Sequence, residues 1–468
     1  MVLVMSEQSS KYKHSRSIYI SYGIGGFVDN FFTAAFTVRV IDFYENELLL
    51  SIFWVGIAFG IYGFWNMIND PLLGWISDKK FKFTKRWGRR YPFFAVGALS
   101  FVWVYLFIFT VPFTDPIGMF IWLLITICLF EFLYSMFIVN YLALFPDKFR
   151  SVAERTRAGA QNTAWGVIGI AFGVLIPPLI IIYGVLSSYI IAALVVSIIG
   201  FIMAIVALPG MKEDEKLIER QLRIIEEQTE KDSFWKVLKY GIKDKNFLAY
   251  ILVALGHAVM TVMMLSSLPY WNKYIIGSSD PELETVMAAG FLVAVLISVP
   301  IWTIIGRKMG NKKAITYGTL LTTILFFPLF FVSDLISTTI IIALIGVGIG
   351  CFWVLMYPAM SDCIDDIVVR TGKRNEGSLT GIRIFTERIS IIIQAVAFAV
   401  IHPLTGYRPG APPGPTSQTL LAQFGIRLLI AGIPMAFYFL AFLLIWKVYK
   451  LDVAKVAENT EYLKQKHL

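Results

Sequence analysis

Long apolar segments recur along the whole chain and are separated by short polar ones. There are about twelve of them, each near the ~20 apolar residues that a helix needs to cross a bilayer. They begin near Ile18, Leu50, Pro92, Ile117, Asn162, Ser188, Phe247, Val286, Ala314, Ile336, Leu379 and Leu420. The pattern predicts an all-α integral membrane protein with twelve transmembrane helices.

The polar loops alternate in charge along the chain. Segments 79–90, 148–157, 307–313 and 370–374, which follow even-numbered spans, are basic, whereas 45–47, 115, 280–284 and 334 are acidic or neutral. Because basic loops stay on the cytoplasmic side, both termini are predicted to be cytoplasmic. The expected location is the plasma membrane, as a multi-pass protein.

A polar segment at 209–245, mixed in charge and helical in period, divides the chain into two six-span halves. We expect an N-terminal bundle at 1–208, a cytoplasmic linker helix at 209–245, a C-terminal bundle at 246–449 and a cytoplasmic tail at 450–468. The loops after spans two and eight share glycine followed by basic residues. This faint symmetry is typical of a transporter built from two repeats.

Composition excludes most other classes of protein. Of 468 residues, 57% are hydrophobic and 16% are charged, which is not a soluble composition. The net charge of +9 lies in loops between apolar runs, so it does not indicate a nucleic-acid binder. The sequence has no phosphate-cradling loop, no nucleophile with a base and no metal-ligand spacing, so we expect neither an enzyme nor a bound cofactor or metal. The expected partners are a small solute and the lipid bilayer, and the expected state is a monomer.

Residues 65–90 carry the most informative polar group. Asp70 lies inside an apolar span, beside Asn69 and Pro71, and a dense basic loop follows. A charge within a membrane span is costly unless it is paired or used, so it indicates an ion or solute path. Asp70 is therefore a candidate coupling site.

The chain resembles the glycoside–pentoside–hexuronide cation symporters, the melibiose-carrier branch of the major facilitator superfamily. The resemblance rests on Asn69-Asp70-Pro71 with Gly74-Trp75 and Asp78, on the following run from Arg86 to Pro92, and on further matches along the chain. Those matches are Tyr22-Gly23 with Asp29, the run from Tyr141 to Pro146, Glu154-Arg155, Asp362 with Asp365, Glu376-Gly377, Arg388, Gly406-Tyr407 and Gly425-Ile426-Arg427. It implies the major facilitator fold, with two six-helix bundles, and cation-coupled symport of a sugar or glycoside by alternating access.

The resemblance assigns roles to some residues of this chain, whereas other site residues of the family are replaced here. Asp29 matches a first-span carboxylate that binds sugar hydroxyls, Trp353 an aromatic wall of the sugar site, and Arg388 an eleventh-span lysine. Asp70 matches one of two cation-binding carboxylates of the second span, and Asn66 replaces the other. A fourth-span carboxylate of the family, shared by sugar and cation, corresponds here to Ile138, and a fifth-span sugar-binding arginine corresponds to Thr163.

These replacements favour a proton over sodium as the coupling ion. Sodium is held by several hard oxygen ligands, and Asp70 with the Asn66 amide is a poor set. A lone carboxylate in a low dielectric instead takes up a proton readily. We therefore expect proton coupling, with sodium coupling and uncoupled transport as alternatives.

Other charged groups lie within the predicted spans. Glu131 is a candidate to supply the missing fourth-span carboxylate to the solute cavity, against a structural hydrogen bond between helices. Arg383 and Glu387 have i,i+4 spacing and are interpreted as a structural ion pair. His257 is interpreted as a packed histidine rather than a proton relay.

Six charged residues near span ends are predicted to act in gating rather than in solute binding. Such clusters can hold neighbouring helix ends together in one state and release them in another. They are Asp78, Arg86, Arg89, Arg90, Asp362 and Asp365.

Three alternatives to sugar symport remain open. The loss of polar sugar-site residues at Ile138 and Thr163 is compatible with a less polar, amphiphilic solute such as a lysolipid. A non-transporting receptor or scaffold gives no reason for Asp70 inside a span, and a membrane-bound enzyme lacks a catalytic set. The sequence names neither the solute nor the direction of transport.

Overall fold

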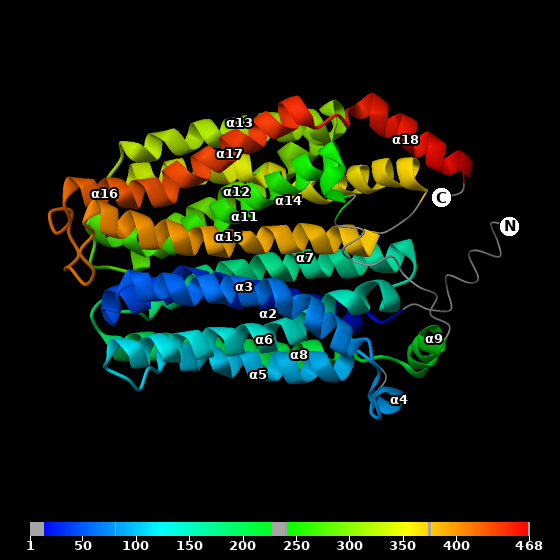
Figure 1. Cartoon of the computed structure of the whole chain (residues 1–468), viewed down its shortest axis with the longest axis horizontal. Coiled ribbons are helices and arrows are strands. Elements are labelled where there is room, and N and C mark those ends of the chain that lie inside the picture. Colours follow the sequence, from blue (N-terminus) through cyan, green and yellow to red (C-terminus); the bar gives the residue numbers. More distant parts are fainter. Residues whose placement is uncertain (1–13, 80, 227–238, 240, 373–375, 467–468) are drawn as a thin grey trace. The chain divides into compact units, whose positions relative to one another are not determined.

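The computed structural model describes residues 14–79, 81–226, 239, 241–372 and 376–466. Twelve of its helices are long and apolar enough to cross a membrane, which confirms the predicted number (Figure 1). They are α2 with η1 (Arg16–Glu47), α3 (Ile52–Ser77), α5 (Tyr91–Phe109), α6 (Pro116–Lys148), α7 (Val152–Leu175), α8 (Leu186–Met211), α11 with η3 (Lys245–Ile276), α12 (Glu282–Met309), α13 with η4 (Asn311–Phe330), α14 (Leu335–Thr371), α15 (Glu376–Thr405), and the run from α16 to η6 (Leu420–Val448).

The fifth span begins ten residues before its predicted start near Asn162, because its charged first turns are helical. Ser151 and Glu154 form a capping box in which each side chain accepts a hydrogen bond from the other residue's backbone N–H. The sequence Glu-Arg-Thr-Arg at 154–157, which the charge pattern assigns to a loop, therefore belongs to α7. Spans five and six are separated by the 3₁₀ turn Pro177–Leu179 and by Gly184, whose φ of 80° suits glycine.

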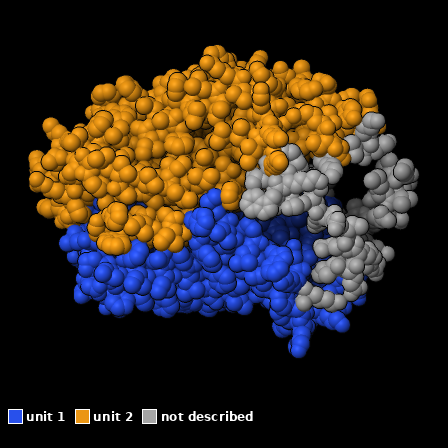
Figure 2. All heavy atoms as spheres, in the orientation of Figure 1, with its two compact units in different colours: residues 1–50, 64–230 blue, residues 51–63, 231–468 orange. Residues whose placement is uncertain are grey.

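The chain divides into two compact units, which Figure 2 shows in different colours. Unit 1 contains residues 1–50 and 64–230, and unit 2 contains residues 51–63 and 231–468. The first turns of α3 thus belong to unit 2 and the rest of α3 to unit 1. The sequence-based domain boundaries differ at this helix and stay a prediction.

Close helix packing in each unit depends on small residues. In unit 1, α2 and α7 approach so closely that a Cβ on Gly23 would lie 2.7 Å from the Gln161 backbone carbon. In unit 2, a Cβ on Gly346 of α14 would lie 2.7 Å from the carbonyl oxygen of Phe291 in α12. Small residues that let backbones approach are typical of helix packing in membranes.

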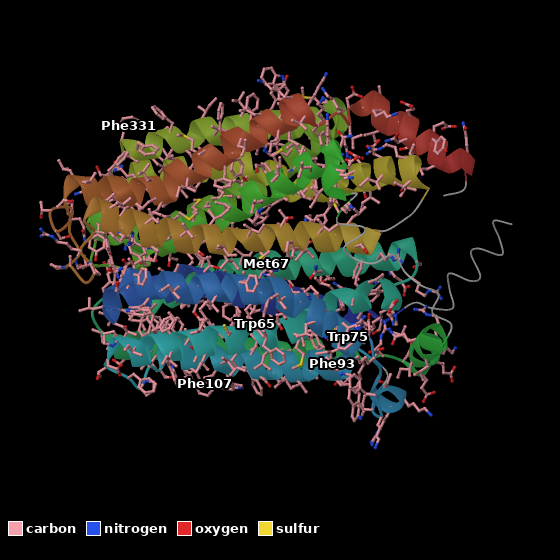
Figure 3. The ribbon with its side chains drawn as sticks, in the orientation of Figure 1. Trp65, Met67, Trp75, Phe93, Phe107 and Phe331 are labelled. Carbon is pink, nitrogen blue, oxygen red and sulfur yellow. The ribbon has the colours of Figure 1, made fainter. Side chains whose placement is uncertain are left out.

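Large apolar side chains on the outside of the units support a membrane setting. Figure 3 labels three of them, Trp75, Phe107 and Phe331, whose exposed fractions are 60%, 49% and 70%. Such side chains are costly in water and favourable in a bilayer.

Beyond the spans, the described residues include the shorter helices α4 (Thr84–Trp87), α9 (Glu215–Glu226) and α18 (Val453–Lys466). Helix α9 corresponds to the first part of the predicted linker helix, while 227–238 and 240 lie outside the described residues. Helix α18 forms most of the tail, for which the sequence predicted no helix.

Candidate functional site

A pair of carboxylates lies where α3 packs against α6 in unit 1. The Ser135 hydroxyl donates to Asp70 Oδ1 over 2.5 Å, and Ser135 Oγ also lies 3.2 Å from Glu131 Oε1. Asp70 stands on α3, whereas Ser135 and Glu131 occupy successive turns of α6. Ser135 and Glu131 are at most 1% exposed. The structure thus brings Asp70 and Glu131 together through one hydroxyl.

Two buried asparagines of α3 accompany this pair. Asn66, one helical turn before Asp70, is fully buried, and neither its Nδ2 nor its Oδ1 has a hydrogen-bond partner among the described residues. Asn69 is also fully buried; its Nδ2 donates to the Glu131 carbonyl over 3.1 Å, and its Oδ1 is unpartnered in the same sense. Buried amides without partners are rare in native proteins and require an explanation such as a bound ion.

The expectation of a lone carboxylate is therefore wrong. A serine hydroxyl has one hydrogen and can donate to only one ionised carboxylate at a time. If both Asp70 and Glu131 were ionised, Ser135 could donate to only one of them, and its oxygen would face an acceptor oxygen of the other without a hydrogen between them. The two negative charges would also repel each other. A proton or a metal cation relieves this repulsion, and the amide oxygens of Asn66 and Asn69 suit a cation.

Asp29, the candidate solute-binding carboxylate, is held by a neighbour that the sequence did not indicate. The Tyr134 hydroxyl donates to Asp29 Oδ1 over 2.5 Å, which fixes this carboxylate relative to α6. Of the two positions where the family has polar side chains, Ile138 is buried and Thr163 is exposed.

In unit 2, Trp353 lies on α14 and Arg388 on α15, both partly buried. The predicted pair of Arg383 and Glu387 is present, with Nη1 and Oε1 3.6 Å apart. Arg388 is one residue further along α15, about 100° around the helix. The solute-binding roles of Asp29, Trp353, Arg388 and Glu131 stay predictions.

His257 is packed, as predicted from the sequence. Its Nδ1 lies 2.8 Å from the Tyr438 hydroxyl, and its ring stacks on Phe352 with centroids 5.0 Å apart. Both partners belong to unit 2.

Part of the predicted gating set of unit 1 forms a compact network. The Arg90 guanidinium binds Asp78 and donates to Ser77 Oγ over 2.6 Å, and Arg89 lies 3.7 Å from Asp78 and 3.8 Å from Asp147. Burial lowers the pKa of Arg90 below its usual value, and the Asp78 charge opposes this shift. Arg86 instead lies over the Trp87 ring, 5.3 Å from its centroid.

Glu213 and Asp147 are not among the residues predicted from the sequence. Glu213 Oε1 accepts from the backbone N–H groups of Arg90 and Tyr91 over 2.6 and 3.0 Å, and so caps the start of α5. Its only sequence signal is an acidic residue directly after span six. Asp147 ends span four beside Lys148, which hides it in a run of mixed charge.

At the end of α14 in unit 2, a network of hydrogen bonds and ion pairs centres on Asp366, which the sequence did not single out; the gating roles of Asp362 and Asp365 stay predictions. Asp366 is buried and accepts from Arg370 at 2.5 Å, Asn246 at 3.1 Å and Asn459 of α18 at 3.1 Å. Arg370 also binds Asp244. Asp362 accepts from Asn311 over 2.7 Å. The i,i+4 spacing of Asp366 and Arg370 is the signal that could have found this network.

The Asp78→Asn variant tests the gating role. Because the Asp78 side chain is 51% exposed, its pairing with Arg90 contributes on the order of 1 kcal/mol, a factor of about five in a population. We expect a several-fold change in maximal transport rate with an unchanged KM, measured from initial uptake at increasing solute concentration. Asp115→Asn, in an exposed helix cap, is the control. A changed KM with an unchanged maximal rate would place Asp78 in solute binding instead.

Comparison with known proteins identifies the family of the chain. The family described as MFS/sugar transport protein matches residues 21–453. The "Sodium-dependent lysophosphatidylcholine symporter 1-A" of Danio rerio is 23% identical over 481 residues, covering 94% of this chain and 86% of the relative. The "Putative sulfoquinovose importer" of Salmonella typhimurium is 25% identical over 463 residues, covering 95% and 92%.

Solved structures share the fold at low sequence identity. A bacterial homologue of the human lysosomal transporter Spinster, in an inward-facing conformation, has a TM-score of 0.63 and 12% identity, covering 93% of this chain and 97% of that one. The nucleoside transporter NupG has a TM-score of 0.61 and 15% identity, covering 92% and 100%. The twelve spans thus adopt the major facilitator fold. From the match over residues 21–453, the chain belongs to the MFS/sugar transport protein family.

Proposed function

We propose that this chain is a secondary active transporter that couples the movement of sodium to symport of a polar or amphiphilic solute. The observation that carries the proposal is the Ser135 hydroxyl between Asp70 and Glu131, beside the unpartnered Asn66 amide. Two carboxylates and two amide oxygens supply the hard oxygen ligands that sodium needs. The sodium-dependent relatives support this choice over the proton that the sequence favoured.

The first candidate solute is a sugar or glycoside. The family description and the importer relative support this class, and the relative's name specifies a sulfonated sugar. Arg388 gives span eleven a guanidinium, whose fork of donors suits a sulfonate or phosphate. Asp29, held by Tyr134, is suited to accept hydrogen bonds from sugar hydroxyls. A Trp353 ring would offer an apolar plane to the C–H face of a sugar.

The second candidate solute is a lysolipid. The buried Ile138, at a position where the resemblance of the sequence implies a carboxylate, makes this part of α6 less polar, and several relatives are named as lysophosphatidylcholine symporters. A lysolipid and a sulfonated sugar share one chemical feature, an anionic tetrahedral group on a polar head. Arg388 would serve either solute.

Coupling requires that cation and solute act on one conformational equilibrium. Each can shift the balance of inward- and outward-open states only through unequal affinity for the two. Asp70 and Asp29 both contact α6, through Ser135 and Tyr134, which are neighbours in sequence. Helix α6 is thus the element through which cation binding would alter solute binding. We further propose a monomer in the plasma membrane with both termini cytoplasmic.

Uptake into proteoliposomes tests this function. Sulfoquinovose, a panel of glycosides and lysophosphatidylcholine would be offered separately under an inward sodium gradient, under an inward proton gradient, and with neither. We expect accumulation of one class of solute under the sodium gradient alone. Accumulation driven only by protons would restore the first expectation, and failure of every solute with folded protein would favour a receptor or scaffold.

A further inference from the structure

A cavity of unit 1 lies apart from the carboxylate pair and takes no part in the proposed function. Its volume is about 630 Å³, and its walls come from the ends of α6 and α8, the start of α7 and the helix α9. Five lysine and arginine side chains line it: Lys148, Arg150, Lys212, Lys216 and Arg220. Figure 1 shows α9 beyond the ends of these spans.

The acidic side chains of the cavity are largely engaged by local donors. Glu154 belongs to the capping box of α7, and Asp214 accepts from the Leu217 backbone N–H over 2.8 Å. Asp147 accepts from Gln221 over 3.2 Å and lies 3.8 Å from Arg220. Exposed Glu215 is the fourth acid. The negative charge of these groups is therefore partly neutralised before any ligand arrives.

Two of the basic side chains remain available to a ligand. Arg150 and Lys212 are exposed and form no ion pair within the described parts of the chain. Lys148 is 9% exposed, and its Nζ donates to the carbonyls of Gly210 and Lys212, which fixes one wall of the cavity. A fixed wall with two available cations is suited to an anionic group.

The depth of the cavity selects the kind of anion. Lys148 ends the fourth span, Ala153 begins the fifth and Met211 ends the sixth, so the cavity lies where hydrocarbon gives way to headgroups. Basic pockets between helices at this level bind phosphate-bearing lipid headgroups. We propose that this cavity binds the phosphate of an anionic phospholipid from the leaflet that α9 faces. The bound headgroup would bridge the span ends and α9.

Lipid titration of the full chain tests this site. Phosphatidylglycerol would be added to the protein in phosphatidylcholine nanodiscs, with bound lipid counted by native mass spectrometry; inorganic phosphate and glycerol phosphate would be added in separate titrations. We expect Arg150→Gln with Lys212→Gln to weaken phosphatidylglycerol binding at least about tenfold, which corresponds to about 1.4 kcal/mol. Arg307→Gln with Lys308→Gln, which removes two exposed charges from the end of α12, is the matched control and should bind normally.

Each other outcome would overturn the proposal. Equal loss in both double variants would mean general attraction to positive charge. Binding of free phosphate without binding of phosphatidylglycerol would make the cavity a site for a soluble anion. If the wild-type protein bound none of these phosphate compounds and its melting temperature did not change, the cavity would not be an anion-binding site.

Discussion

Replacing Asp70 by Asn is expected to abolish sodium-driven uptake. The amide keeps the hydrogen bond from Ser135 but removes one of the two charges that offset the dehydration of sodium. Asp70 is partly buried, so losing its charge should cost about 1.4 to 3 kcal/mol, which lowers the affinity for sodium about tenfold to a hundredfold. The direct measurement is the rise in melting temperature of the purified protein on replacing choline with sodium. This rise should disappear in Asp70→Asn, and it requires no knowledge of the solute.

Asp334→Asn is the matched control for this prediction. It makes the same chemical change at the cap of α14, where asparagine caps as well as aspartate and where the side chain is exposed. Sodium should stabilise this variant as much as wild type. A sodium response that survives in Asp70→Asn would remove Asp70 from the cation site, whatever its effect on uptake.

Hydropathy and charge predicted the twelve spans because both properties are local. A span needs about 20 apolar residues in sequence, and no distant contact decides that requirement. The prediction was wrong where helix formation depends on capping rather than on apolarity. The start of α7 is polar and charged, and the hydrogen bonds of Ser151 and Glu154 make it helical.

Only the α3 residues of the candidate cation site could be predicted from the sequence. Asp70 was recognisable because a carboxylate inside a span is conspicuous, and Asn66 because it lies one turn away on the same helix. Its neighbour Glu131 depends on how α6 is rotated and displaced along α3. The spacing of residues within α6 does not determine how α6 is aligned along α3. The contacts of Asn69 and Ser135 with α6 and α3 fix this alignment in the structure.

The same limit applies to the ends of the spans. Asp78, Arg89 and Arg90 form one dense run and were predicted together, and the structure joins them. Glu213, which lies just before α9, contacts Arg90, and Asn459 of α18 contacts Asp366. Both residues are far in sequence from the partners that they contact. Neither residue differs in type from its exposed neighbours, so only the fold distinguishes them.

Replacing Glu131 by Gln is the second large effect we expect. The amide retains a contact for Ser135 but leaves Asp70 as the only carboxylate beside this hydroxyl. We expect sodium affinity to fall about tenfold to a hundredfold, the range found when groups that support a metal ligand are changed. A single carboxylate leaves sodium with too few hard oxygen ligands, so uptake under a sodium gradient should weaken correspondingly. Uptake measured under separate sodium and proton gradients would detect this loss and any change of coupling ion.

Restoring a carboxylate at Asn66 distinguishes a relocated ligand from a structural role of Glu131. In the double variant Asn66→Asp with Glu131→Gln, the second charge lies one turn from Asp70 on α3, the position that the family resemblance indicates. If Glu131 supplies charge to the cation, this variant should recover most of the lost sodium response. Asn66→Asp alone should not improve sodium binding, because a third carboxylate adds repulsion. A double variant that is worse than Glu131→Gln would mean that Glu131 only stabilises the packing of α3 on α6.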